Sequence, residues 1–254
     1  MYPELFHFAH LTIYTYAFLI GLGTLAAVKY TKIQAKKDFD NISLPYSFFY
    51  LIFIMGFIGG KIFFYLENPQ LYINDPGLLL KNFSGGFVFY GSFIFIIPAV
   101  IWYLKKKHIS FWPMLDILAI TTTIVHSIGR LGCFFGGCCY GKPTNSFTGM
   151  VFPGTHGTAV HPTQLYESLG VLAIMIILLQ LKKRSHFPGQ IFLTYTILYA
   201  VLRQIIELFR GDERGFIIEG YLSHSQFISL LIIALSGYLI FKLKHKNYSY
   251  ETLH

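Results

Sequence analysis

Charged residues are scarce in this sequence. Asp, Glu, Lys and Arg make up only 13% of its 254 residues, which is half of the roughly 25% found in an average soluble domain. This scarcity excludes a disordered tail, a fibrous repeat and a soluble enzyme with a charged surface. Hydrophobic residues account for 54% of the chain and aromatic residues for 18%, and the mean hydropathy is +0.53. The composition therefore indicates an integral membrane protein.

Acidic residues are the scarcer of the two charge types. The chain has 12 Asp and Glu against 20 Lys and Arg, which gives a formal net charge of +8. In a soluble protein this excess would suggest a nucleic-acid partner. In so apolar a chain it instead predicts basic cytoplasmic loops beside an anionic membrane surface, so we expect no nucleic-acid partner.

Long apolar runs define the fold class. Seven stretches are long enough to cross a bilayer as helices, and none alternates as a barrel strand does. We therefore predict an all-α integral membrane protein with seven transmembrane helices, forming a single polytopic domain over residues 1–254. The first stretch lacks a positive leader and a cleavage site, so we expect a mature span there. The predicted spans are Phe8–Val28, Tyr46–Leu66, Gly86–Leu104, Phe111–Phe135, Gln164–Leu181, Gly189–Phe209 and Gln226–Phe241.

The distribution of basic residues predicts the orientation. Thirteen of the 20 Lys and Arg follow the odd-numbered spans. By the positive-inside rule these loops are cytoplasmic, so the N-terminus lies outside and the C-terminus in the cytoplasm. The segments 67–84 and 141–163 are then external, and they either cap the outer face or simply connect spans. Seven basic residues do not follow this pattern: Lys61, Lys81, Arg130, Lys142, Arg203, Arg210 and Arg214.

The densest polar cluster, residues 126–144, ends the fourth predicted span and contains Arg130. An arginine inside an apolar span is costly unless it faces a cavity or a partner. Its planar fork suits a phosphate or a carboxylate. Arg130 therefore indicates either an anion-binding site or a structural ion pair, for which Asp116 and Glu207 are the candidate partners.

A second arginine lies in the sixth predicted span. Arg203 and Glu207 share one helix face at i and i+4, and Arg210 follows one turn later. Arg203 and Glu207 either form a pair that keeps the helix neutral or belong to a site. If Arg203 and Arg130 lie together near the outer leaflet, they can clamp one phosphate, and phospholipid headgroups are the most plentiful phosphates at that depth.

The start of the fifth predicted span carries further polar groups. Gln164 and Glu167 lie at i and i+3 beside a helix N-terminus, which favours anions and acceptor groups, and Thr163 is the predicted N-cap. The same stretch also fits an interfacial helix start anchored by Tyr166. Two other polar or glycine-rich segments, 85–92 and 14–16, have helix packing as their ordinary explanation.

The only three cysteines are Cys133, Cys138 and Cys139, and their spacing fits no common zinc or haem pattern. Three interpretations stay open. Cys133 and Cys138 form a disulfide, one cysteine is a nucleophile whose thiolate is favoured by nearby Arg130, or all three are small packing residues. A metal site that includes His126 or His161 is the least favoured interpretation. We predict no metal ligands and no cofactor.

Taken together, these motifs resemble the prolipoprotein diacylglyceryl transferase family. The resemblance is carried, from the first span to the sixth, by the following residues: Tyr14 with Gly21, Gly59-Gly60-Lys61, Gly85-Gly86 with Gly91, Gly129-Arg130-Leu131-Gly132, Gly141-Lys142-Pro143-Thr144, residues 161–167, and Arg203 with Glu207-Leu208-Phe209-Arg210. It implies an enzyme of the bacterial cytoplasmic (inner) membrane whose active site faces outward. Such an enzyme moves the diacylglyceryl group of phosphatidylglycerol to the lipobox cysteine thiol of a prolipoprotein, and glycerol phosphate leaves. The implied partners are phosphatidylglycerol, the prolipoprotein signal segment and membrane lipids.

The resemblance also implies roles for individual residues. Arg130 and Arg203 would bind the phosphate and stabilise its growing charge, and Glu207 would orient Arg203. Tyr14 would reach the headgroup. The remaining residues implied in substrate binding are Gly86, Gly129, Gly141, His161, Gln164, Tyr166, Glu167 and Arg210.

Three positions depart from the family pattern. Tyr90 replaces a glycine-flanked histidine, Cys133 replaces an asparagine, and Cys138 replaces an acidic residue. We predict a divergent branch with a rebuilt catalytic site, in which the base is Tyr90, Glu207 or a cysteine thiolate. Two alternatives stay open: a transferase that uses its own cysteine as nucleophile toward another acceptor, and a non-catalytic protein that binds lipid or lipoprotein.

Overall fold

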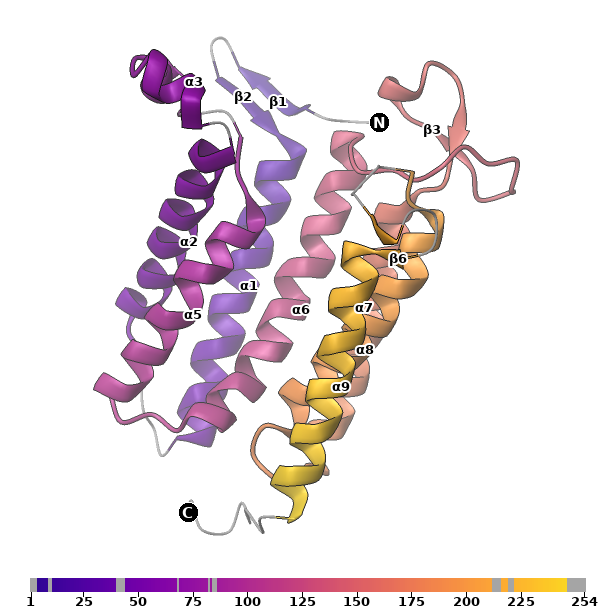
Figure 1. The fold of residues 1–254 in the computed structure, drawn as a ribbon. Helices are drawn as coiled ribbons and strands as arrows, with labels where there is room; N and C mark the ends of the chain where they lie inside the picture. Colours follow the sequence, from indigo (N-terminus) through magenta and orange to yellow (C-terminus); the bar gives the residue numbers. More distant parts are fainter. Residues whose placement is uncertain are drawn as a thin grey trace. The chain divides into compact units, whose positions relative to one another are not determined.

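The structure, a computed structural model, describes residues 4–8, 11–39, 44–67, 69–81, 83, 86–211, 216–218 and 222–245. Within these ranges the chain is predominantly helical (Figure 1). Its long helices are α1 (Thr15–Asp38), α2 (Tyr46–Glu67), α5 (Phe89–Lys106), α6 (Phe111–Gly136), α7 (Thr163–Lys182), α8 (Gln190–Phe209) and α9 (His224–His245). The short elements are β1 (Glu4–Phe8), β2 (Leu11–Tyr14), α3 (Pro69–Asn74), α4 (Leu78–Lys81), β3 (Met150–Val151), η1 (Pro153–Thr155), β4 (Ala159–Val160), β5 (Phe216–Ile218) and β6 (Leu222–Ser223).

The structure agrees with a helical membrane protein. Of the described helices, α2, α6, α7, α8 and α9 are long and apolar enough to cross a membrane. They match five of the predicted spans within a few residues. The count of seven spans, the orientation of the termini and the single-domain organisation stay predictions.

The predicted first span is wrong at its start. Residues 4–8 and 11–14 pair as the antiparallel strands β1 and β2, and α1 begins only at Thr15. His7 and Thr12 face each other across this hairpin, with His7 Nδ1 2.9 Å from Thr12 Oγ1. A polar pair of this kind supports a two-stranded hairpin. At its other end α1 extends beyond the predicted span to Asp38 and includes the lysine-rich segment.

The chain divides into two compact units, one of residues 35–114 and the other of residues 1–34 with 115–254. In the first unit α2 and α5 lie side by side (Figure 1). A Cβ on Gly59 would lie 2.3 Å from the carbonyl oxygen of Gly91, so glycine is required for this close approach. Ser92 Oγ donates to the Gly56 carbonyl at 2.8 Å. Buried Lys61 donates to the Gly86 carbonyl at 2.9 Å, which explains one basic residue that breaks the charge pattern.

We expect Gly91→Ala to destabilise the protein by about 1–3 kcal/mol, because over-packing forces the two backbones apart. Its Cβ would lie 2.5 Å from the Gly59 carbonyl oxygen. Thermal unfolding in detergent micelles measures the effect. Gly237→Ala in α9 is the matched control, since nothing lies within 4 Å of its Cβ, and it should be neutral or stabilising by up to about 1 kcal/mol. Equal melting temperatures for the two variants would contradict the packing argument.

In the second unit, glycines bring α1 against α6. A Cβ on Gly129 would lie 3.1 Å from Ile20, and one on Gly132 would lie 3.0 Å from Tyr16. Further along this contact, the hydroxyls of Thr31 and Thr121 are 2.7 Å apart. Gly129 and Gly132 therefore face α1, and α6 contacts α7 and α8 through its other side.

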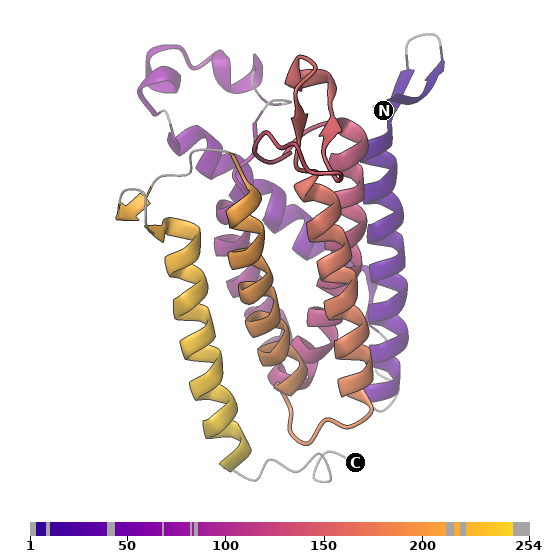
Figure 2. The same cartoon turned by 90° about the vertical axis from the view of Figure 1, so that its right-hand side faces the viewer.

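Helices α7, α8 and α9 follow one another side by side (Figure 2). Asp116 of α6 fixes the start of α8, since its carboxylate accepts from the backbone N–H groups of Gly189 at 2.7 Å and Phe192 at 2.8 Å. These are the N-cap and N3 positions, so Asp116 supplies the cap that the local sequence lacks. The core between these helices consists of Ala119, Ile120, Ile174, Leu178 and Ile191.

Candidate active site

Glu167 lies at the centre of the site. Its side chain is only 2% exposed, and its Oε2 is 3.0 Å from Arg130 Nε. Its Oε1 accepts from the Tyr199 hydroxyl at 3.1 Å and lies 3.1 Å from His126 Nε2. Groups from α6, α7 and α8 therefore meet at one buried carboxylate. Such a charge is tolerated only because it is paired and hydrogen-bonded.

The sequence predicted other partners for Arg130, and the structure corrects them. Asp116 is occupied in capping α8, and Glu207 pairs with Arg203. The actual partner, Glu167, was predicted only as a residue lining the substrate site. Because Glu167 engages Arg130 through Nε, this pair leaves the outer fork of the guanidinium free for another acceptor.

Tyr199 was not among the predicted site residues, and His126 was not predicted to act in this site. Both were detectable from i, i+4 spacing. His126 and Arg130 share one face of α6, and Tyr199 lies one turn before Arg203 on the face that Glu207 also shares. The rings of His126 and Tyr199 meet edge to face with centroids 5.2 Å apart.

Arg203 and Glu207 form the predicted intrahelical pair. Arg203 Nη2 donates to Glu207 Oε2 at 2.6 Å, and Ser225 Oγ donates to the same oxygen at 3.3 Å. The other nitrogen, Arg203 Nη1, is buried without a hydrogen-bond partner. Tyr199, one turn before Arg203 on the same face of α8, donates to the Glu167 carboxylate that binds Arg130, so the two arginines belong to one region. A buried donor without a partner is costly and indicates a ligand acceptor.

The turn after α6 brings the cysteines together. The Gly137 N–H donates to Phe134 O and the Cys138 N–H to Cys133 O, both at 3.2 Å. With Gly137 at φ +69°, this is a Schellman motif, which places the residue after the turn against the last helical turn. The backbone geometry of this turn therefore holds Cys138 beside Cys133.

Two buried side chains of α7 fix this turn from the other side. Gln164 Nε2 donates to the Cys138 carbonyl at 2.5 Å, and Thr163 Oγ1 donates to the Cys139 carbonyl at 2.8 Å. The prediction of Thr163 as N-cap is wrong, because Pro162 occupies the cap position and the Thr163 hydroxyl serves the cysteine turn.

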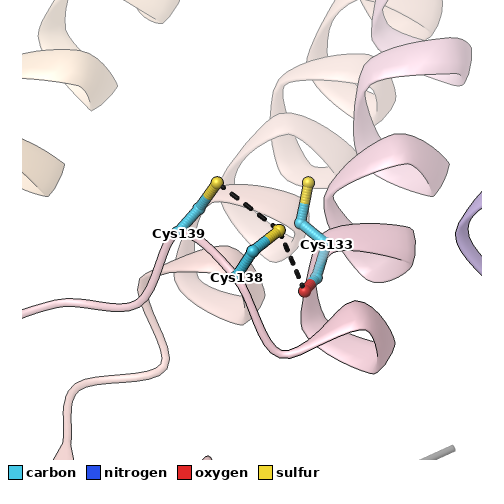
Figure 3. Close-up of side chains that lie close together, drawn as sticks. All are labelled: Cys133, Cys138 and Cys139. Carbon is cyan, nitrogen blue, oxygen red and sulfur yellow. Dashed lines mark hydrogen bonds between the residues drawn. The ribbon is translucent and has the colours of Figure 1, made fainter. Parts of the chain in front are cut away.

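All three thiols are free, so the Cys133–Cys138 disulfide interpretation is not what the structure contains. Their sulfur atoms lie within 4.8 Å of one another, and those of Cys138 and Cys139 are 3.6 Å apart (Figure 3). Hydrogen bonding to the Cys133 and Cys138 thiols, together with the positive charges of Arg130 and Arg210, lowers the pKa of the Cys139 thiol. Thiolate character is therefore favoured at Cys139, which lies outside the helix.

The segment 141–163 lies against the ends of α7 and α8. The Gly141 N–H donates to His161 O at 2.8 Å, and a Cβ on Gly141 would lie 2.2 Å from Phe209 O. Glycine is therefore required at this position. Beside it is a cleft of about 420 Å³, whose lining residues are Ser146, Thr148, His161, Tyr166, Leu202, Ile205, Ile206 and Phe209.

The predicted stretch 161–167 divides between two faces. His161 and Tyr166 line the cleft, with His161 Nδ1 3.3 Å from the Tyr166 hydroxyl. Gln164 and Glu167 instead point to α6 and its turn, as described above. Gln164 Oε1 is a second buried polar atom of this region without a hydrogen-bond partner.

The remaining predicted residues lie elsewhere. Arg210 is buried and pairs by a β-bridge with Gly141. Tyr14 ends β2 and is exposed, and Gly129 packs on α1. Gly86 and Tyr90 belong to the 35–114 unit, where Gly86 has φ +37° and Tyr90 is exposed near the start of α5.

Comparison with known proteins gives matches to a single family over nearly the whole chain. The model of the family described as Prolipoprotein diacylglyceryl transferase matches residues 3–242. A phosphatidylglycerol--prolipoprotein diacylglyceryl transferase of Clostridium tetani is 36% identical over 247 residues, covering 96% of this chain and 98% of that protein. A second protein, named phosphatidylglycerol--prolipoprotein diacylglyceryl transferase 2, from Clostridium perfringens, is 32% identical over 251 residues and covers 95% of both chains. The family match and this near-complete coverage confirm the resemblance seen in the motifs: this chain belongs to the prolipoprotein diacylglyceryl transferase family.

Proposed function

We propose that this protein transfers the diacylglyceryl group of phosphatidylglycerol to the lipobox cysteine thiol of a prolipoprotein. Its relatives carry these two substrates in their names. In the reaction the acceptor sulfur attacks the glyceryl carbon, a carbon–sulfur bond forms, and the carbon–oxygen bond to phosphate breaks. The electron pair of that bond goes to the phosphate oxygen, the thiol gives its proton to a base, and glycerol phosphate leaves.

The observation that carries this proposal is the pair of converging arginines. Arg203 Nη1 is a buried donor without a protein acceptor, and the partly exposed Arg130 is engaged by Glu167 at Nε, which leaves its outer fork for a ligand. A phosphodiester supplies the acceptor oxygens that both require. As the carbon–oxygen bond breaks, negative charge grows on the phosphate, so these donors bind the transition state more strongly than the ground state.

Other residues support these two groups. Glu167 fixes Arg130, and Glu207 with Ser225 fixes Arg203. His161 and Tyr166 line the cleft, whose other walls include Leu202, Ile205 and Phe209. This mostly apolar cleft fits an acyl chain or the apolar part of a signal segment.

Because Glu207 is held in an ion pair, its proposed role is to orient Arg203, and Tyr90 and the cysteine thiols are the stronger candidates for the base.

The proposal includes the predicted topology. Seven spans with the N-terminus outside would put the C-terminal ends of α6 and α8, and the loops that follow them, at the outer face, where a prolipoprotein presents its lipobox. The external segments 67–84 and 141–163 would flank that face.

Transfer in defined vesicles tests the proposal. Protein reconstituted with labelled phosphatidylglycerol should add a diacylglyceryl group to a lipobox peptide, seen as the mass increase of the peptide. A peptide with serine in place of the lipobox cysteine, and vesicles that contain phosphatidylethanolamine alone, should give no product. Folded protein that forms no product from the complete mixture would overturn the proposed function.

A further inference from the structure

The three cysteines at the end of α6 form a cluster, and a base role for one thiol does not explain why three thiols lie together. We propose that Cys133, Cys138 and Cys139 bind one thiophilic divalent metal ion of the Zn²⁺ type and leave its fourth coordination position open for an external thiol.

The positions of the sulfur atoms match this use. A tetrahedral zinc ion with bonds of 2.3 Å to sulfur requires sulfur atoms about 3.8 Å apart. The Cys138 and Cys139 sulfur atoms are 3.6 Å apart, and all three lie within 4.8 Å of one another (Figure 3). Small side-chain rotations therefore complete the site. Soft thiolate ligands select zinc or copper(I) over magnesium or calcium.

The site is held in place without a metal. The Schellman motif fixes Cys138 over Cys133. Gln164 and Thr163, each 1% exposed, hold the carbonyl groups of Cys138 and Cys139. Hydrogen bonds around the ligands that restrict their backbone are the usual support of a metal site. The site does not need to be assembled by the ion, so less of the binding free energy is lost in ordering the chain.

The site is also accessible. Cys138 and Cys139 are exposed, so an ion and a further ligand can reach the sulfur atoms.

Three protein ligands leave a zinc ion with one open position, as in catalytic rather than structural zinc sites. A thiol that binds there loses its proton and remains nucleophilic. Under the proposed function, on which this step rests, that thiol is the lipobox cysteine. Its proton leaves to solvent, its sulfur attacks the glyceryl carbon as the carbon–oxygen bond breaks, and the metal keeps its oxidation state. A metal-bound thiol would therefore be activated without a protein base.

Cobalt substitution tests the site without any turnover. Full-length protein in detergent, kept reduced by a phosphine, is titrated with Co²⁺ alone. We expect one Co²⁺ per chain, sulfur-to-cobalt charge-transfer absorption, and displacement by Zn²⁺. The variants Cys133→Ser, Cys138→Ser and Cys139→Ser should each weaken Zn²⁺ binding at least about tenfold. His156→Asn is the matched control, since His156 is an exposed ligand type in the following loop with φ +49°, which asparagine tolerates.

The open position is tested by adding a lipobox peptide to the cobalt form. The cysteine peptide should change the visible cobalt bands, and its serine counterpart should not. Failure to bind metal while all three thiols are reduced and the chain elutes as folded protein would overturn the site, as would undiminished binding by the serine variants. If the metal binds but no lipid is transferred, the proposed function fails and the site stands. If protein shown to be metal-free transfers lipid at the full rate, the role in thiol activation fails and the function stands.

Discussion

Arg130→Lys should reduce diacylglyceryl transfer by on the order of 10²–10³-fold while the protein stays folded. Lysine keeps the positive charge beside Glu167, so the buried carboxylate retains a partner. What it loses is the planar fork that can hold two phosphate oxygens while another nitrogen engages Glu167. The loss should therefore appear mainly in kcat, because the missing contacts strengthen as charge grows on the phosphate.

Initial rates in phosphatidylglycerol vesicles, measured over a range of lipobox-peptide concentrations, check this prediction. Arg184→Lys is the matched control, since Arg184 is exposed after α7 and should transfer at the wild-type rate. A rate for Arg130→Lys within a few fold of the wild type would contradict the assignment of phosphate to Arg130. It would also leave Arg130 with the structural role that the sequence offered as the alternative.

Much of the fold follows from composition and length, because lipid leaves a polar backbone few options. Apolar runs predicted α2, α6, α7, α8 and α9 closely, since a helix satisfies its own backbone groups. The same reasoning failed at the start of the first predicted span, Phe8–Val28, because residues 11–14 form strand β2 and α1 begins only at Thr15. The hairpin formed by β1 and β2 depends on pairing between its two short segments, which hydropathy does not register.

Local rules also explain the contact between two of the three cysteines. The spacing of Cys133 and Cys138 around Gly137 is that of a helix end with a Schellman motif, so this contact was available from the sequence. The position of Cys139 was not available, because it depends on Thr163 and Gln164, more than 20 residues later in the chain. The cluster therefore emerges only where a local turn meets a helix from a distant segment.

The partner of Arg130 illustrates the limit of sequence patterns most clearly. The spacing of His126 and Arg130 shows which residues share a face of α6, but it does not show which helix that face meets. Asp116, Glu207 and Glu167 were all acidic groups in or next to a span, and hydropathy treats them alike. Only the packing of α6, α7 and α8 selects Glu167 and assigns Asp116 to a helix cap.

Glu167→Ala should destabilise the protein by about 3–5 kcal/mol, because it leaves the guanidinium of Arg130 buried without its Nε acceptor. It also removes the acceptor of the Tyr199 hydroxyl and the partner of His126. Glu167→Gln should cost less, because one amide oxygen still accepts from Tyr199 or Arg130. Thermal and denaturant unfolding in the same detergent measure both losses, and unchanged stability of Glu167→Ala would contradict a buried ion pair.

The double variant Arg130→Met with Glu167→Leu separates stability from function. Replacing both partners of a buried pair by apolar groups of similar volume is often neutral, so this variant should regain most of the stability lost in Glu167→Ala. Its transfer activity should nevertheless stay as low as that of a variant without Arg130, because no apolar side chain donates to phosphate. Stability that returns together with activity would show that the pair serves only the fold. Stability that returns without activity assigns Arg130 to the substrate and makes Glu167 the residue that orients it.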